Sequence, residues 1–172
     1  GVVLNPKDER EAADFVENTT SMLLFATVFL TIIFFFGMPY IIQVLAPGFT
    51  DNKEAYELAV HFGKIIFPYI IFISLAAHFT SINNVHEHFA AGAFAPAILN
   101  ISFILSLFFL TPLVTTAGHA LSYGVLIGGV LQFLYLYRAV LNFYRPRIRI
   151  PVLNEKLRKF FKLFLPGVVG SG

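Results

Sequence analysis

The 172-residue sequence contains no cysteine and few charged residues. The absence of cysteine excludes a disulfide framework, thiol catalysis and a Cys-ligated metal site. Asp, Glu, Lys and Arg make up 13% of the residues, about half the share in a typical soluble domain, and apolar residues make up 57%. The formal net charge of +2 points to no particular partner. Together with a mean hydropathy of +0.75, this composition is typical of a membrane protein.

The few charges are unevenly distributed along the chain. None occurs within residues 18–50, 65–86 or 88–137. A membrane-spanning helix needs roughly 20 predominantly apolar residues, so the first two windows can each hold one span and the third can hold two. These windows exclude a soluble enzyme, a nucleic-acid-binding domain and a disordered tail. The sequence therefore predicts an all-α polytopic membrane protein.

Breaks in the apolar pattern divide the chain into segments. A polar helix is expected over residues 1–18, because Asn5 can cap a helix and Pro6 suits its first position. Pro47 and Gly48 end the first span with a turn, and a polar run divides the longest window. The expected four-helix region 19–144 has spans at about 20–46, 58–83, 89–113 and 120–143, followed by a linker at 145–165 and a truncated span at 166–172.

Proline and small residues within the spans indicate where the helices bend and pack. Pro68 and Pro96 each remove a backbone donor and are expected to kink their helices. Such bent spans are common in transporters. Ala120, Gly124 and Gly128 recur at every fourth residue, a spacing that lets helix backbones approach closely. We interpret these three residues as a packing face within a bundle.

The basic residues predict the orientation of the spans. Ten of the twelve Lys and Arg residues lie in the leading segment or from Arg138 onward, and basic residues mark the cytoplasmic side, so both ends are expected in the cytoplasm. The linker at 145–165 alternates basic and apolar residues, which is typical of an amphipathic helix on an anionic leaflet. This explains its charges more simply than nucleic-acid binding. The membrane-surface residues would be Arg145, Arg147, Arg149, Lys156, Lys159 and Lys162.

Polar residues inside spans are costly in lipid, which makes them candidates for function. Lys64 could line a path for an anionic substrate, or its ammonium group could snorkel to the interface. His78 could relay protons or be a satisfied buried imidazole. Asn84 could contact substrate or end its helix. Asn100 could contact substrate or make an interhelical hydrogen bond. These four residues are the predicted substrate-path candidates.

No catalytic or metal motif accompanies these residues in the sequence. His86 and His88 lie two positions apart and would point to different faces of a helix, which argues against a metal site. The spans contain no pair of carboxylates, and the sequence has neither a Gly-x-Ser-x-Gly motif nor a glycine-rich phosphate loop. We therefore expect no enzymatic activity, no cofactor and no metal.

Several stretches resemble, in order, successive helices of one family of membrane proteins. Residues 67–75 (FPYIIFISL) resemble the fourth transmembrane helix of the MurJ/MviN lipid II flippases, and residues 93–101 (AFAPAILNI) resemble its junction with the fifth. Residues 124–132 are similar to the sixth helix. Residues 45–49 resemble the end of the third helix, and residues 165–167 resemble the start of the seventh.

The resemblance implies helices three to six of the amino-terminal lobe of a two-lobed multidrug/oligosaccharidyl-lipid/polysaccharide exporter. Such a protein moves undecaprenyl-pyrophosphate-linked peptidoglycan precursor from the inner to the outer leaflet of the bacterial cytoplasmic membrane by alternating access. The implied partners are this precursor, anionic phospholipid and the second lobe. The family's cavity arginines lie on helices one, two and eight, so no residue here inherits their role. His88 stands where the family often has Arg.

The two ends of the sequence suggest a fragment. The chain begins at Gly1 without methionine and stops at Gly172 within an apolar segment. Three other interpretations are weighed against the flippase. A drug/cation antiporter of the same superfamily would need a membrane-embedded acid, which no predicted span contains. A stand-alone four-helix structural protein would be complete at these ends, and a membrane enzyme of lipid metabolism would need catalytic carboxylates or paired histidines.

Overall fold

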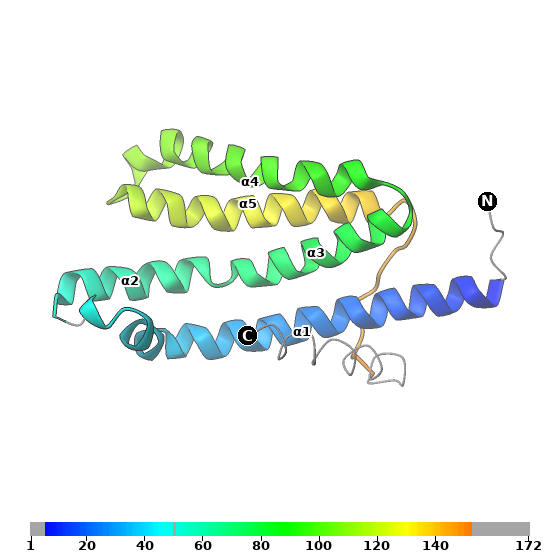
Figure 1. Ribbon diagram of the computed structural model, residues 1–172, viewed down its shortest axis with the longest axis horizontal. Coiled ribbons are helices and arrows are strands. Elements are labelled where there is room, and N and C mark those ends of the chain that lie inside the picture. The colour runs from blue at the N-terminus through cyan, green and yellow to red at the C-terminus, as the bar shows by residue number, and fades with distance from the viewer. Residues whose placement is uncertain (1–5, 50, 153–172) are drawn as a thin grey trace. The chain divides into compact units, whose positions relative to one another are not determined.

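The computed structural model describes residues 6–49 and 51–152 as a series of long α-helices (Figure 1). Four stretches of this described part are long and apolar enough to cross a membrane, and it contains no strand, which confirms the predicted all-α polytopic class. The elements are α1 (Pro6–Leu45), η1 (Pro47–Phe49), α2 (Lys53–Ile66), α3 (Tyr69–Val85), α4 (Phe89–Leu110), η2 (Thr111–Leu113) and α5 (Ala117–Val140), where η1 and η2 are short 3-10 turns.

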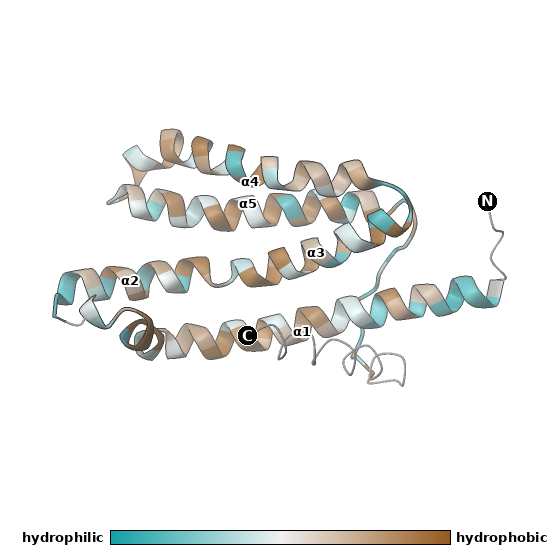
Figure 2. Ribbon diagram, viewed as in Figure 1, coloured by the Kyte–Doolittle hydropathy of each residue, from teal (hydrophilic) through white to brown (hydrophobic). Residues whose placement is uncertain are grey.

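The helix boundaries follow local signals. α1 joins the expected polar helix and the first span into one helix that ends before Pro47. Asn52 caps α2 by accepting a hydrogen bond from the Ala55 N–H at 3.1 Å, and Thr116 caps α5 by accepting one from the His119 N–H. Hydrophilic residues gather in the first turns of α1 and at the turn between α3 and α4 (Figure 2), whereas the middles of the helices are mostly apolar, with single hydrophilic bands within α4 and α5.

Pro68 interrupts the second span rather than only bending it. α2 ends two residues before this proline and α3 begins directly after it. The proline nitrogen has no hydrogen, so it cannot donate to the carbonyl of Lys64 as a helix would require. Backbone bonding resumes across three residues, where the Ile70 N–H donates to the Phe67 carbonyl at 3.0 Å and the Ile71 N–H donates to the Pro68 carbonyl at 3.1 Å. Pro96, in contrast, lies inside α4, which continues through it.

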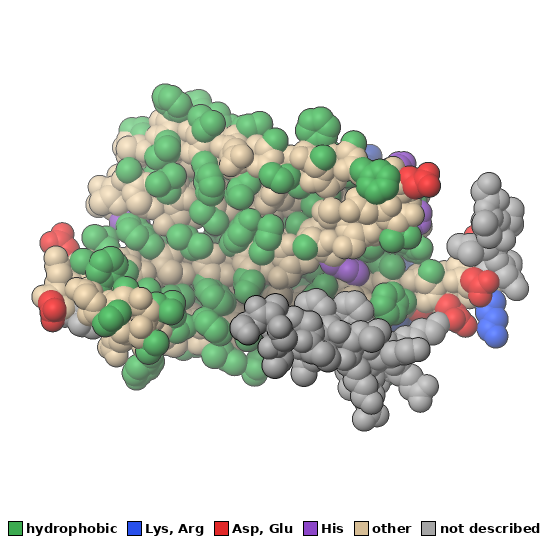
Figure 3. Space-filling model, in the orientation of Figure 1, with side chains coloured by type: hydrophobic (Ala, Val, Ile, Leu, Met, Phe, Trp, Pro, Cys, Tyr) green, Lys and Arg blue, Asp and Glu red, His purple; other side chains and the backbone are tan. Residues whose placement is uncertain are grey.

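The chain divides into two compact units, residues 23–145 and residues 1–22 with 146–172. In the larger unit α5 lies between α4 and α3 (Figure 1) and also packs against α2. A larger share of α5 is buried than of any other membrane-length stretch in the described residues. The apolar side chains on the outer faces of the helices are exposed (Figure 3), as expected of surfaces that meet lipid. α5 is therefore the centre of this unit.

Small residues allow α4 to approach α5 closely. A Cβ atom on Gly128 would lie 2.7 Å from Leu99 Cδ1 and 3.1 Å from Ser102 Cβ. A Cβ atom on Gly124 would lie 2.8 Å from Ser106 Cβ. These distances are shorter than carbon–carbon van der Waals contact, so larger residues would separate the helices. Ala120, one turn earlier, is completely buried.

The helices of the larger unit alternate in direction. α3 and α5 are parallel, because their contacts follow the same chain order. Tyr69 of α3 lies against Gly129 near the middle of α5. Further along both helices, Phe79 of α3 lies against Phe133 and Tyr137 of α5. α4 runs antiparallel to α5, as the Gly124 and Gly128 contacts require. The second half of α1 runs antiparallel to α2. This alternation is what successive crossings of a membrane require.

The turn between α3 and α4 contains Glu87 in a left-handed conformation, with φ of 61°. The His88 N–H donates to the Asn83 carbonyl at 2.8 Å, and the Glu87 N–H donates to the Asn84 carbonyl at 3.0 Å. This is the Schellman pattern, which satisfies the last carbonyls of a helix and usually places glycine where Glu87 stands. A side chain in this conformation costs roughly 1–2 kcal/mol.

We predict that Gly128→Ile and Gly124→Ile each lower the free energy of unfolding of the full-length protein by about 1–3 kcal/mol, because the new side chain would overlap α4. Thermal unfolding in detergent measures this effect. Gly37→Ile is the matched control, since a Cβ atom there would meet only Ile41 Cδ1, at 3.9 Å. Equal melting temperatures for Gly128→Ile and the wild type would contradict the packing interpretation.

We predict that Glu87→Gly raises the free energy of unfolding by about 1 kcal/mol, because glycine adopts the left-handed conformation without strain. Glu87→Asn should give a smaller gain, and Glu87→Val should destabilise the protein. The three variants can be compared in the same thermal unfolding assay. A lower stability for the glycine variant would show that the Glu87 side chain makes a stabilising contact.

Candidate functional site

The exposed face of α3 carries mostly small and polar residues, together with the exposed Val85 at its end. Ala77, Ser81 and Asn84 are exposed at positions i, i+4 and i+7, whereas Leu75 and Phe79 on the opposite face are buried. The Ser81 hydroxyl donates to the Ala77 carbonyl at 3.1 Å, so it remains in contact with its own helix. A polar stripe on a membrane helix is expected to face water or another helix rather than lipid. This face is therefore the best candidate for a substrate path in the described chain.

Two of the predicted substrate-path residues belong to this face. His78 is half-buried at its edge, with its ring centre 5.8 Å from that of Phe79. Asn84 is exposed in the last turn of α3, and its carbonyl accepts the Glu87 N–H. The Asn84 backbone thus contributes to the helix end while its side chain is free to meet solvent or ligand.

The other two candidates lie elsewhere. Lys64 lies in the last turn of α2, with Nζ 5.2 Å from the centre of the Phe35 ring, a distance typical of a cation–π contact. The 17 residues of α3 separate Lys64 from the far end of the polar face, about 25 Å at the helical rise. Asn100 is exposed on α4. The four predicted residues therefore do not form a single pocket in the described part of the chain.

A buried amide of α5, which the sequence analysis missed, links two helices. Gln132 is 3% exposed, and its Nε2 donates to the Ala95 carbonyl of α4 at 2.7 Å. Its Oε1 is buried and has no hydrogen-bond partner among the described residues. Gln132 continues the four-residue spacing of Ala120, Gly124 and Gly128, and this spacing could have identified it as a contact with α4.

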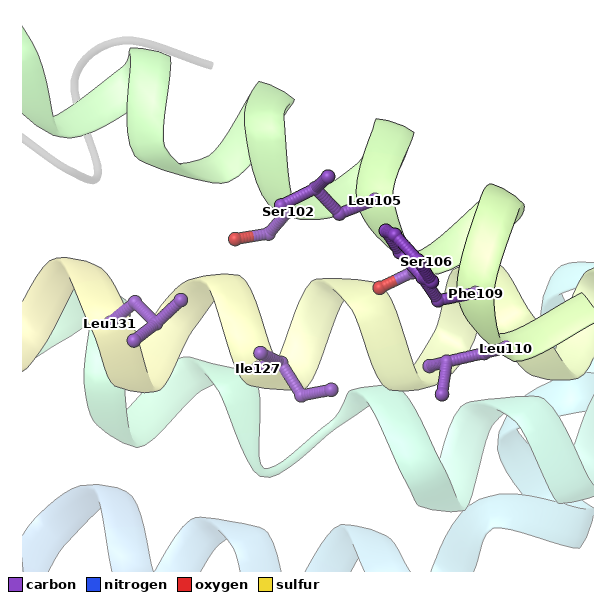
Figure 4. A pocket seen from close by; sticks show the side chains of 7 residues that line it. All are labelled: Ser102, Leu105, Ser106, Phe109, Leu110, Ile127 and Leu131. Carbon is purple, nitrogen blue, oxygen red and sulfur yellow. The ribbon is translucent and has the colours of Figure 1, made fainter.

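A shallow groove lies between α4 and α5 (Figure 4). Its polar groups are the hydroxyls of Ser102 and Ser106 on the α5 side of α4, and Ser102 Oγ donates to the Ile98 carbonyl at 2.8 Å. The groove offers an apolar surface with no titratable side chain among its lining residues, and the Ser102 hydroxyl is bonded to its own helix. The lining residues are Ser102, Leu105, Ser106, Phe109, Leu110, Ile127 and Leu131.

Histidines contact aromatic rings near both ends of α5. The rings of His61 and His119 lie 5.2 Å apart, and the His86 ring stacks on Phe143 at 4.1 Å. The described residues contain no group of three or more His, Asp or Glu side chains that could hold a metal ion. These contacts join α2 to α5 and the end of α3 to the segment after α5.

The described part of the basic linker is not helical. Residues 145–152 have no regular secondary structure, in contrast to the expected amphipathic helix. Arg145 and Arg147 are exposed, whereas Arg149 pairs through its guanidinium with Asp14 of α1 at 3.1 Å. Three further predicted membrane-surface residues, Lys156, Lys159 and Lys162, lie outside the described residues, as does the predicted span at 166–172.

These features define a polytopic α-helical membrane protein with an interrupted helix and a polar helix face. The sequence model of the family described as "Lipid II flippase MurJ" matches residues 3–172. The chain therefore belongs to the MurJ lipid II flippase family.

Curated relatives agree with this assignment. A "Lipid II flippase MurJ" of Burkholderia cenocepacia is 35% identical over 119 residues, which cover 69% of this chain and 23% of the relative. A "Probable lipid II flippase MurJ" of Rhizobium tropici is 33% identical over 94% of this chain and 31% of the relative. A protein of the same description from Buchnera aphidicola is 34% identical, over 96% and 32%. The chain thus spans about a third or less of the length of these relatives.

We predict that Gln132→Leu changes the free energy of unfolding by less than about 1 kcal/mol, because the lost interhelical bond is offset by removal of an unpartnered buried oxygen. Gln132→Glu should destabilise the protein by about 2–3 kcal/mol, since it places a carboxylate inside the bundle. Thermal unfolding of the full-length protein measures both effects. Similar stability of the leucine and glutamate variants would show that water reaches this position.

Proposed function

We propose that this chain is part of a flippase that moves undecaprenyl-pyrophosphate-linked peptidoglycan precursor from the inner to the outer leaflet of the bacterial cytoplasmic membrane by alternating access. The observation that carries the proposal is the family match, which extends over residues 3–172. The transport role, rather than an enzymatic one, agrees with the sequence, in which no catalytic motif was found. No cofactor is invoked.

The described helices would form part of the amino-terminal lobe of this flippase. α1, α2 with α3, α4 and α5 would correspond to helices three to six, with both ends of the chain in the cytoplasm. The bias of Lys and Arg toward those ends supports this orientation, and the alternating helix directions agree with four successive crossings. The partners would be the lipid-linked precursor, anionic phospholipid and the second lobe of the same polypeptide.

The polar face of α3 would line one wall of the path. His78 and Asn84 lie on this face and could contact the polar head of the precursor, whereas Lys64 would lie nearer the other end as a cation lining the path of the anionic substrate. Asn100 would face another helix or the cavity, since an exposed amide is unfavourable in lipid. Rocking of the lobe would use the interruption at Pro68 and the bend expected at Pro96, with α4 and α5 moving together.

Complementation tests the proposed function. The full-length protein should restore growth and outer-leaflet precursor in bacteria depleted of their own lipid II flippase. Restored drug resistance without restored cell-wall synthesis would instead support a drug/cation antiporter. No rescue by a full-length protein that reaches the membrane would contradict the flippase function.

We predict that Lys64→Gln lowers the rate of precursor translocation several-fold without lowering thermal stability, and that Lys64→Arg retains activity because the charge is kept. The matched control is Lys53→Gln in the same helix, where Nζ lies 3.9 Å from Glu57 at an exposed position. Translocation in proteoliposomes measures the rates. Equal rates for Lys64→Gln and the wild type would remove Lys64 from the substrate path and leave the snorkelling interpretation.

A further inference from the structure

The amino-terminal half of α1 holds the segment after α5 through the backbone of that segment. The amide of Asn18 donates from Nδ2 to the Val152 carbonyl at 2.6 Å and accepts the Val152 N–H at Oδ1 at 2.8 Å. One turn away, Ser21 Oγ accepts the Arg149 N–H at 3.0 Å. Asn18 and Ser21 are 1% and 0% exposed, so these bonds are shielded from water. We call this set of contacts the clasp.

Charge reinforces the clasp. The Arg149 guanidinium donates to Asp14 Oδ1 at 3.1 Å and to the Asp14 carbonyl at 2.6 Å, and it lies 3.7 Å from Glu17 Oε2. The guanidinium of Arg149 is therefore paired with two acidic side chains of α1. Arg147, two residues earlier, is exposed.

The clasp leaves three apolar side chains exposed. Ile148, Ile150 and Val152 are 67%, 84% and 63% exposed, whereas Arg149 and Pro151 between them are half-buried. Alternation with a period of two is the pattern of an extended backbone. The N–H and C=O of one extended residue point to the same side, which explains how a single amide can bind both groups of Val152. The segment 147–152 is thus an amphipathic strap.

The position of the clasp on α1 sets the depth of the strap. Glu17 is the last charged residue before the uncharged window 18–50, so the helix enters the hydrocarbon just after it. Asn18 and Ser21 hold the strap at this boundary. Three exposed apolar side chains at the boundary between water and hydrocarbon favour insertion into the lipid interface.

We propose that the strap is an interfacial anchor that binds a lipid surface containing anionic phospholipid. Ile148, Ile150 and Val152 insert at the boundary between headgroups and acyl chains, and Arg147 meets lipid phosphates. Arg149 does not bind lipid, because Asp14 and Glu17 hold it in the clasp. The anchor extends the membrane-surface role predicted from the sequence for the basic linker. Over the described residues an extended strap, rather than a helix, makes the lipid contact. This role does not depend on flippase activity.

Spin labelling of the full-length protein tests the proposal. Nitroxides are attached at Ile148→Cys, Ile150→Cys, Val152→Cys and Arg147→Cys, one at a time, in a background without other cysteines; this chain contributes none. The protein is reconstituted in vesicles of phosphatidylethanolamine and phosphatidylglycerol. We expect positions 148, 150 and 152 to be accessible to oxygen but shielded from a water-soluble nickel reagent, and position 147 to show the reverse.

Two outcomes would overturn the proposal. Access of the nickel reagent to all four positions would place the strap in water. Shielding of positions 148, 150 and 152 from both reagents would mean that another part of the protein covers them. Neither outcome requires a transport measurement, so failure of the anchor is distinguishable from failure of the flippase function.

Variants separate the clasp from the lipid contact. Asn18→Leu removes both bonds to Val152 and should abolish the contrast between position 147 and its apolar neighbours. In Arg147→Gln, labels at positions 148, 150 and 152 should remain accessible to oxygen and shielded from the nickel reagent. In vesicles without phosphatidylglycerol the wild type should insert less deeply, and Arg147→Gln should be less sensitive to this lipid. If position 147 and its apolar neighbours still differ in accessibility in Asn18→Leu, the role of the clasp is overturned. If removal of phosphatidylglycerol changes the insertion depth equally in Arg147→Gln and in the wild type, the role of Arg147 is overturned.

Discussion

The close approach of α5 to its neighbours is the contact on which the larger unit depends. Apolar side chains gain little by leaving lipid for each other, so membrane helices associate mainly through close packing and a few hydrogen bonds. Gly124 and Gly128 bring α4 near, and Gly129 makes room for Tyr69 and Phe72 of α3. Because glycines on two faces of α5 leave space for side chains of its neighbours, this helix can pack tightly against partners on both sides. The parallel and antiparallel order of the helices follows from these contacts.

Polar groups within the bundle are satisfied mainly by their own helices. Thr27 Oγ1 donates to the Leu23 carbonyl at 2.6 Å, and Ser122 Oγ donates to the Gly118 carbonyl at 2.8 Å. Gln132 instead bonds across to α4. On the exposed face of α3, Ser81 also bonds to its own helix, through the Ala77 carbonyl, and Asn84 is exposed in the last turn.

In the smaller unit, a single side chain, that of Asn18, holds the segment after α5 in an extended conformation. An isolated run of alternating basic and apolar residues suits either an amphipathic helix or an extended strap. Asn18 supplies a donor and an acceptor in the geometry of a peptide group, and the backbone of Val152 pairs with it. Once Arg149 is also held by Asp14 and Glu17, the extended form of residues 147–152 satisfies backbone groups that a helix would satisfy internally.

The sequence by itself determined the all-α membrane class, because charge-free windows, prolines and small-residue spacing are local signals. The interruption at Pro68 and the α4-facing glycines lie where these signals placed a bend and a packing face. Only the tertiary structure decided which polar residues meet: it separated Lys64 from Asn84, joined Gln132 to Ala95, and paired Asn18 with Val152. Such pairs lie far apart in the chain, and their geometry depends on how helices pack, so no local pattern encodes them.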